Sequence, residues 1–308
     1  MLNAQRLSKR FGMIQAVNDV GFTIESGTVC GFLGPNGAGK TTTLRMIAGL
    51  LMPDSGSISI DGLDVQKDWR LVRRRIGYLP ESAPCYPEMR VQEYLEFRAR
   101  VFMGRLDRAV IDRSLEACQL GPVRRRLVGQ LSKGYRQRVG LAATLVHAPD
   151  VLILDEPTVG LDPNQVMIVR DLVKEFSSGG TVLFSSHLLG EIEAVCDHLV
   201  LVDQGRLIAS GPVEWFRKHV AGSGQYQLEV DDPSAARCLG GIEGIGSIQV
   251  DQVEEGWHTI MIYSEHEDDL RETIARRLAS EGILARQIVR SEPSLEMLFQ
   301  NLTSRDAR

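Results

Sequence analysis

A run of residues near the N-terminus has the types and spacing that hold the phosphates of a nucleotide. It fits the pattern G-x-x-x-x-G-K-[ST] at every position and consists of Gly34, Pro35, Asn36, Gly37, Ala38, Gly39, Lys40 and Thr41, followed by Thr42. Glycines let backbone N–H groups turn toward an anion, and the N-terminus of a following helix favours negative charge. In such a loop the lysine reaches the β- and γ-phosphates, and the threonine hydroxyl binds Mg²⁺. The alternative is a glycine-rich turn that merely caps a helix, which does not require the full pattern.

Two adjacent acids, Asp155 and Glu156, follow an apolar run at residues 151–154. Such a run predicts a buried strand of a parallel sheet, and α/β sheets bind ligands beyond the carboxyl ends of their strands. Asp155 can hold Mg²⁺ with water in between, and Glu156 can polarise an attacking water. Because two acids that cap a strand are also a common surface feature, this assignment depends on the phosphate loop in the same chain.

The segments around these residues predict an α/β architecture. Short apolar runs that predict strands occur at residues 29–34, 57–60, 76–79, 151–154 and 181–184, and residues 199–209 resemble a hairpin. A helical pattern follows the phosphate loop at residues 40–51. From Val91 to about Leu120, apolar residues recur at helical spacing among charged ones. We therefore expect a helical subdomain over about residues 82–148.

A change of pattern predicts a second, smaller domain. Residues 221–224, Ala-Gly-Ser-Gly, form a flexible stretch, so we expect one domain at residues 1–220 and another at residues 225–304. Beyond this stretch, strands are expected at residues 225–230, 247–253, 258–263 and 283–290, and helices at residues 268–281 and 294–302. Strands and helices in this order predict an α+β domain of ferredoxin-like type.

The composition is that of an ordinary globular protein. Of the 308 residues, 43% are apolar and 24% are charged, which disfavours disorder and suggests two domains. No stretch is long and apolar enough for a transmembrane helix, and residues 1–11 lack the apolar core of a signal peptide. The five cysteines have no CxxC spacing, so neither a disulfide frame nor a zinc site is expected. These observations favour a cytoplasmic protein.

Charge is unevenly distributed along the chain. The net charge of −5 gives no reason to expect nucleic-acid binding, yet residues 67–138 contain 17 basic and 8 acidic residues, a net of +9. This basic stretch could face anionic lipid, a protein partner or a polynucleotide, or it could be a solvated helical surface. From Ala221 onward the balance reverses to 8 basic and 16 acidic residues.

Several further segments match one family. Residues 131–137, Leu-Ser-Lys-Gly-Tyr-Arg-Gln, resemble the LSGGQ signature of ABC-type ATPases, and residues 159–162, Val-Gly-Leu-Asp, resemble that family's D-loop. His187 stands where the family has its switch histidine, and Phe11 stands where it has an aromatic ring that stacks on adenine. The resemblance covers about residues 1–220 with all elements in the family's order. The first domain is therefore identified as a member of the ABC nucleotide-binding domains, which have a P-loop NTPase fold.

This resemblance implies an ATPase that uses ATP and Mg²⁺ and works as a head-to-tail dimer with two ATP molecules at its interface. The implied catalytic residues are Lys40, Glu156 and His187. Ser132 and Gly134 would contact the γ-phosphate of the ATP held by the partner subunit, and Asp162 would couple the two sites. In isolation, Ser132 could be a helix cap, Asp162 a helix start and Phe11 a core residue.

Some residues depart from the family's pattern. Lys133 and Tyr135 are unusual within the signature, although Ser132 and Gly134 are kept. Glu81 stands where most members have the Q-loop glutamine. An ionised carboxylate can bind Mg²⁺ and accept a hydrogen bond but cannot donate one. We therefore expect Thr41, Asp155 and Glu81 as metal ligands, with an altered Mg²⁺ dependence rather than inactivity.

Residues 78–81 and 86–97 indicate which group within the ABC family the chain resembles. They are similar to ABC-2-type exporter ATPases, a group that includes gliding-motility-associated and sodium- or copper-linked systems, and in which this region faces the membrane subunit. Exposed Tyr86 and Tyr94 beside Arg98 would suit such an interface, whereas Tyr94 and Phe97 could instead be core residues. The sequence Ser-Leu-Glu-Met-Leu-Phe at residues 294–299 also resembles the tail of these exporters.

The sequence thus predicts the ATPase subunit of an exporter, peripheral on the inner face of the cell membrane. Its expected partners are a separate integral membrane permease and a second nucleotide-binding subunit, which we expect to be an identical chain, and no nucleic acid. One alternative is a soluble ABC ATPase that acts on nucleic acid or ribosomes, which often carries duplicated ATPase domains, coiled-coil inserts or basic arms. Another is a scaffold without hydrolysis, which conflicts with Glu156 and His187. The cargo is not encoded in this chain.

Overall fold

The computed structural model describes the chain except for residues 187, 221–223, 255, 265–267 and 292–308. His187 and the helix expected at residues 294–302 therefore lie outside the described residues. The chain divides into two compact units, Met1–Val213 and a second that begins at Glu214. This division falls just before the predicted linker at residues 221–224, at the start of helix α8 (Val213–Val220). The domain bounds expected from the sequence, 1–220 and 225–304, stay a prediction.

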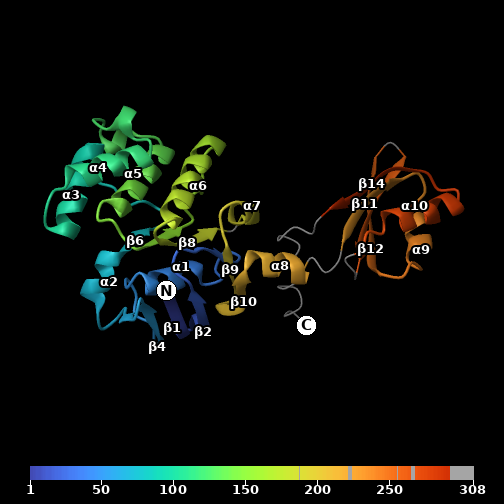
Figure 1. Cartoon of the computed structure of the whole chain (residues 1–308), viewed down its shortest axis with the longest axis horizontal. Coiled ribbons are helices and arrows are strands. Elements are labelled where there is room, and N and C mark those ends of the chain that lie inside the picture. The colour runs from blue at the N-terminus through green and yellow to red at the C-terminus, as the bar shows by residue number, and fades with distance from the viewer. Residues whose placement is uncertain (187, 221–223, 255, 265–267, 292–308) are drawn as a thin grey trace. The chain divides into compact units, whose positions relative to one another are not determined.

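The first unit is built around a six-stranded sheet, coloured from blue to yellow in Figure 1. Its strands, in spatial order, are β10 (Arg206–Pro212), β9 (His198–Asp203), β3 (Val29–Leu33), β8 (Thr181–Ser186), β7 (Val151–Asp155) and β6 (Ile76–Leu79). Neighbouring strands from β9 to β6 are parallel, and only β10 is antiparallel to its neighbour. Every residue of β3, β7 and β8 is buried, as expected for parallel strands covered on both faces. The predicted α/β core is confirmed.

A second sheet in this unit is antiparallel. Its order is β2 (Ile14–Ile24), β1 (Leu2–Phe11), β4 (Ser55–Ile60) and β5 (Leu63–Asp64). Helix α1 (Lys40–Ile47) contacts both β1 and β7, so it lies between the two sheets. One apolar core joins these layers: Leu7 and Ile24 from the second sheet pack with Ile47 and Ile153. This packing holds α1 between the two sheets.

Helices complete the first unit. Those beside the parallel sheet are α2 (Trp69–Arg75), α6 (Pro163–Ser177) and α7 (Leu189–Glu193). Three helices and two 3₁₀ turns form the predicted helical part: α3 (Val91–Met103), α4 (Arg108–Ala117), η1 (Gly121–Val123), η2 (Val128–Gln130) and α5 (Lys133–Leu145). Figure 1 shows α3, α4 and α5 together at the end of the unit away from β1, β2 and β4. No helix among the described residues is both long and apolar enough to cross a membrane.

The structure decides between the two interpretations of Tyr94, an exposed interface residue or a core residue. Its side chain is buried, and its hydroxyl donates to the backbone oxygen of Pro84 at 2.8 Å. Burial raises the pKa of Tyr94 to about 12. Tyr86 does lie at the surface, with its ring edge-on to those of Tyr94 and Phe97. Tyr94 is therefore a core residue, as the alternative interpretation of the spacing held.

The second unit has the predicted α+β pattern. Its elements are β11 (Gln225–Val230), α9 (Ala235–Leu239), β12 (Ile245–Glu254), β13 (Trp257–Ser264), α10 (Arg271–Ser280) and β14 (Ala285–Ser291). The sheet order is β12-β13-β11-β14 with antiparallel pairs throughout, which is the ferredoxin-like β-α-β-β-α-β arrangement. Alternate residues of β11, such as Tyr226 and Leu228, pack with Ile274 and Leu278 of α10.

Candidate active site

The phosphate loop connects β3 to α1 in a conformation that requires glycine at two positions. Gly39 is the N-cap of α1 with φ of 98°, and a Cβ there would lie 2.4 Å from the backbone oxygen of Ala16. At Gly34, a Cβ would lie 2.3 Å from the backbone oxygen of Val202. Both glycines thus let the loop lie against neighbouring backbone while the first N–H groups of α1 stay available to an anion.

The Lys40 side chain points back into this loop and is buried. Its ammonium donates to the backbone oxygen of Gly34 at 2.7 Å and lies 3.3 Å from Oε1 of Glu156. The side chain is therefore held by loop carbonyls on one side and by the predicted catalytic carboxylate on the other. A buried cation at this point offers its charge to phosphate oxygens in the loop.

Asp155 forms the predicted cation-binding corner together with Thr41. The Thr41 hydroxyl donates to Oδ1 of Asp155 at 3.1 Å, and the Ser185 hydroxyl donates to the same oxygen at 2.9 Å. Asp155 is fully buried at the end of β7, and the Tyr78 hydroxyl lies 3.5 Å from its Oδ2. Burial, followed by the charge of Asp155, raises the pKa of Tyr78 above its usual value. A hydroxyl beside a hydrogen-bonded carboxylate is an oxygen donor set that fits Mg²⁺.

Glu156 begins a tight turn after β7. Its φ is 49°, in the left-handed region, and its backbone N–H donates to the Ser185 hydroxyl at 2.9 Å. Glu156 lines a pocket of about 590 Å³ that also contains the phosphate loop and Glu81, so these predicted residues converge. Gln204 and the segment Ile14, Gln15 and Ala16 complete this side of the pocket.

A buried glutamate connects the turn after Glu156 to the segment that carries His187. Oε2 of Glu191 accepts hydrogen bonds from the hydroxyls of Thr158 at 2.6 Å and Ser186 at 2.9 Å. His187 directly follows Ser186 in sequence and lies outside the described residues. Glu191 therefore joins the end of β8 to the turn that holds Glu156.

Phe11 lies at the surface at the end of β1, with the Lys9 ammonium 5.8 Å from its ring centroid. It is paired with Ile14 across the β1–β2 turn, and Ile14 lines the pocket. Phe11 itself is not among the residues that line the pocket. Its role as a stacking platform for adenine stays a prediction.

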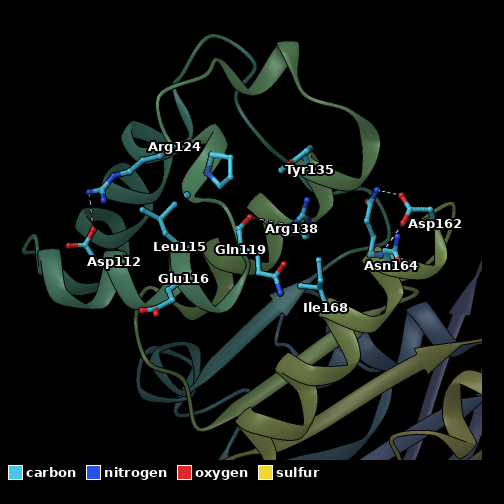
Figure 2. A pocket seen from close by; sticks show the side chains of 13 residues that line it. Asp112, Leu115, Glu116, Gln119, Arg124, Tyr135, Arg138, Asp162, Asn164 and Ile168 are labelled. Carbon is cyan, nitrogen blue, oxygen red and sulfur yellow. Dashed lines mark hydrogen bonds and ion pairs between the residues drawn. The ribbon is translucent and has the colours of Figure 1, made fainter.

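The other predicted contacts do not join the phosphate loop in the same chain. Ser132 is the N-cap of α5, and its Oγ accepts from the Tyr135 N–H. Asp162 is the N-cap of α6 and accepts from the Gln165 N–H at 3.0 Å. Asp162 instead borders a separate cleft of about 750 Å³ between α4, α5 and α6, where Tyr135, Arg138 and Asn164 also lie (Figure 2). Within one chain, neither Ser132 nor Asp162 is among the residues that line the pocket of the phosphate loop.

Ser185, Glu191 and Tyr78 were not predicted from the sequence. Ser185 and Ser186 follow directly after the apolar run 181–184, so polar side chains at the carboxyl end of a parallel strand were the available signal. Glu191 and Tyr78 gave no such signal, because their partners become neighbours only in the folded chain.

These features define the P-loop class of nucleotide-binding proteins: a parallel strand, a glycine-rich loop that starts a helix, and acids at the end of a nearby strand. The family model for the ABC transporter matches residues 17–159. Similarity to known proteins extends over the whole chain. The linearmycin resistance ATP-binding protein LnrL of Bacillus subtilis is 32% identical over 100% of both chains. The bacitracin transport ATP-binding protein BcrA of Bacillus licheniformis is 35% identical over 96% of this chain and 95% of the relative.

Solved structures agree with the sequence relatives. The structure of an ATP-binding subunit of an ABC transporter matches 71% of this chain and 93% of its own, with a TM-score of 0.65 and 30% identity. The chain belongs to the ABC transporter family, as an ATP-binding subunit that hydrolyses ATP.

Proposed function

We propose that this protein is the ATPase subunit of an exporter of ABC-2 type, bound at the inner face of the cell membrane to a separate permease. The relatives whose names refer to resistance or drug transport support this assignment. Two copies of the chain would close head to tail, each phosphate loop facing the signature of the other copy. The observation that carries the ATPase role is the convergence of Lys40, Thr41, Asp155 and Glu156 in one corner.

Each residue of this corner has a distinct role in hydrolysis. Lys40 neutralises charge on the phosphates, and the N–H groups at the start of α1 hold them. Thr41 and Asp155, with Glu81 nearby, would hold Mg²⁺, which supplies charge neutralisation at the β- and γ-phosphates. Glu156 orients the attacking water and takes up its proton, and His187 would position the same water. Ser132 and Gly134 of the partner subunit would close over the γ-phosphate.

A groove on the first unit supports the docking of a membrane partner. It has a volume of about 430 Å³ and lies between the core sheet and the helical part, with Ile76, Pro84, Val101 and Phe102 among its lining residues. Phe102 is stacked on His147 at 4.6 Å, and the Arg98 guanidinium lies 4.9 Å from the Phe102 ring. An apolar floor beside a guanidinium fits an amphipathic helix with an acidic residue. We assign this groove to a cytoplasmic segment of the permease.

The ATPase role is tested by the change Glu156→Gln. We expect hydrolysis to fall by about 10²- to 10⁴-fold, the usual contribution of a general base, while ATP binding persists. If the Glu156→Gln variant hydrolysed ATP at the wild-type rate, the proposed role of Glu156 would be contradicted.

Docking is tested with tagged Glu156→Gln protein in the presence of ATP, used to capture partners from detergent-solubilised membranes. We expect a polytopic membrane protein in stoichiometric amount, identified by mass spectrometry, and its loss when Val101→Asp is added. The matched control is Leu284→Asp, since both side chains are more than half exposed. Capture of ribosomal or DNA-bound partners instead would favour the alternative of a soluble ABC ATPase. Equal capture of the membrane protein by the Val101→Asp and Leu284→Asp variants would exclude the groove as its docking site.

A further inference from the structure

Helix α2 presents arginines and large apolar side chains at the surface of the first unit. Arg70, Arg73 and Arg74 are exposed, and none of them forms an ion pair with a residue that the structure describes. Trp69 is 48% exposed and Leu71 is 55% exposed. Exposed apolar side chains gathered beside cations indicate a surface that binds a partner.

The acids near α2 interact with other groups. Asp61 and Asp150 lie 3.4 Å and 3.7 Å from the guanidinium of Arg75. Asp64 accepts from two backbone N–H groups, and Asp68 accepts from the Asp64 N–H at 3.0 Å. None of these carboxylates pairs with the three exposed arginines, so the outside of α2 keeps a positive charge.

Helical spacing places these side chains around Val72, the one buried residue of α2. At 3.6 residues per turn, Arg70 and Arg74 lie nearly opposite Val72, with Trp69 on one flank and Leu71 on the other. The Arg70 guanidinium lies 5.2 Å from the centroid of the Trp69 ring. Cations therefore stand farthest from the core, and an apolar side chain lies on each side of them. We call these four exposed residues the outer surface of α2.

The outer surface of α2 is continuous with the groove that we assign to the permease. Arg73 lines that groove, and its guanidinium lies 5.9 Å from the Trp69 ring and 5.7 Å from the Phe102 ring. Leu50 and Val101 line the same groove, and both are more than half exposed. Figure 1 shows α2 on the same side of the first unit as α3, which carries Val101 and Phe102. Because a permease lies in the bilayer, a surface that adjoins its docking groove faces the lipid around it.

We propose that the outer surface of α2 binds the anionic headgroups of the inner leaflet beside the permease. This inference rests on the proposed function, which sets the side of the chain that faces the membrane. Arg70 and Arg74 bind lipid phosphates, while Trp69 and Leu71 enter the boundary between headgroups and acyl chains. The cations alone would suit any polyanion. The indole and the leucine beside them favour lipid, since tryptophan is enriched at membrane–water interfaces.

The lipid contact is tested by co-sedimentation of the full chain with vesicles. We expect binding to phosphatidylcholine mixed with phosphatidylglycerol, and none to phosphatidylcholine alone. Arg70→Gln combined with Arg74→Gln should weaken partitioning by about 20-fold, since each arginine near an anionic surface contributes about five-fold. Neither arginine lines the groove, so the variant leaves the lining of the groove unchanged.

The matched control is Arg105→Gln combined with Arg108→Gln, which removes the same charge from exposed positions outside α2. We expect this control to bind the mixed vesicles nearly as well as the wild type does. Equal weakening by the two double variants would show that net charge alone governs binding, and it would overturn the proposal. Binding of the wild type that does not depend on phosphatidylglycerol would overturn it as well.

Insertion of the indole gives a second readout that does not depend on the arginine variants. In a chain with Trp215→Phe and Trp257→Phe, Trp69 is the only tryptophan. We expect its fluorescence emission to shift to shorter wavelength when vesicles with phosphatidylglycerol are added, because the ring leaves water for the interface. An unchanged emission spectrum in the presence of these vesicles would overturn the contact.

The vesicles contain no permease, so this test is separate from that of the proposed function. If the Arg70 and Arg74 variant bound vesicles normally but failed to capture the membrane protein, the outer surface of α2 would belong to the protein interface, and the proposal would be overturned. Arginine-dependent vesicle binding by a chain that captures no membrane protein would support the lipid contact and contradict the proposed function.

Discussion

The Thr41 hydroxyl and the Asp155 carboxylate are hydrogen-bonded at 3.1 Å although 114 positions separate them in the chain. Thr41 stands in the first turn of α1, and Asp155 is the last residue of β7. Ser185 at the end of β8 donates to the same carboxylate oxygen. Three elements of the core therefore hold one buried acid in a fixed orientation beside the phosphate loop, which is the arrangement that a cation-binding acid requires.

The first prediction concerns the charge of this acid. In Asp155→Asn the amide oxygen can still accept from Thr41 and Ser185, but the negative charge is lost. We expect the Mg²⁺ concentration for half-maximal hydrolysis to rise by about 10- to 100-fold. A Mg²⁺ titration of ATPase activity measures this shift. Ser185→Ala, which keeps the charge and removes one donor, should shift the titration less. An equal or larger shift in Ser185→Ala would mean that orientation, not charge, limits binding.

The second prediction concerns Glu81 in place of the usual glutamine. Glu81 lines the pocket with Thr41 and Glu156, so its charge lies among the groups that meet the triphosphate. Glu81→Gln removes one negative charge and adds a hydrogen-bond donor. We expect hydrolysis to persist with a changed Mg²⁺ dependence. Superimposable Mg²⁺ titrations of the wild type and the variant would show that Glu81 does not take part in cation binding.

The third prediction separates backbone strain from close packing in the phosphate loop. Gly37 and Gly39 both have positive φ, 82° and 98°, but only Gly39 faces a neighbouring atom, the Ala16 oxygen. Replacing either by alanine should cost about 1–2 kcal/mol of strain. Gly39→Ala should lower the free energy of unfolding further, because its Cβ would lie 2.4 Å from that oxygen. Urea unfolding without nucleotide gives the comparison, and equal losses would show that the loop relaxes away from Ala16.

Sequence patterns predicted the parallel core and the phosphate loop because both depend on local residue types. The strand at residues 76–79 and the run before Asp155 are short, apolar and bounded by polar residues, which is a sufficient signal. Strands β1 and β2 were missed. They alternate buried and exposed residues irregularly, and several shifts of register interrupt their pairing. Charged residues such as Arg6 and Lys9 within β1 further obscured the pattern.

The limits of prediction at the site have a similar cause. Lys40, Thr41, Asp155 and Glu156 belong to patterns whose chemistry is fixed by their neighbours in sequence. The role of Glu191, by contrast, depends on hydrogen bonds from the hydroxyls of Thr158 and Ser186, which are distant from it or outside its helix and become its partners only in the folded chain. The sequence could not decide whether Tyr94 is exposed or buried, because helical spacing alone does not say which face of α3 meets the core.

The last prediction concerns the pH dependence of stability through His147. Its Nε2 lies 2.9 Å from the Ile76 oxygen, which can only accept, so Nε2 carries the proton, and buried Nδ1 has no hydrogen-bond partner among the described residues. Burial, and to a lesser degree the charge of Arg98, lower the pKa of His147 below its usual value of 6.5. Below about pH 6.5 the unfolded chain therefore binds a proton that the folded chain resists. The variant His147→Gln keeps a donor for Ile76 but does not titrate. As the pH falls from about 7 to 5, we expect the free energy of unfolding to fall more steeply in the wild type than in this variant.

Urea unfolding across this pH range measures the difference. Parallel curves for the two proteins would show that His147 accepts its second proton without cost to stability. His198→Gln serves as the control and should differ less from the wild type, because His198 is less buried.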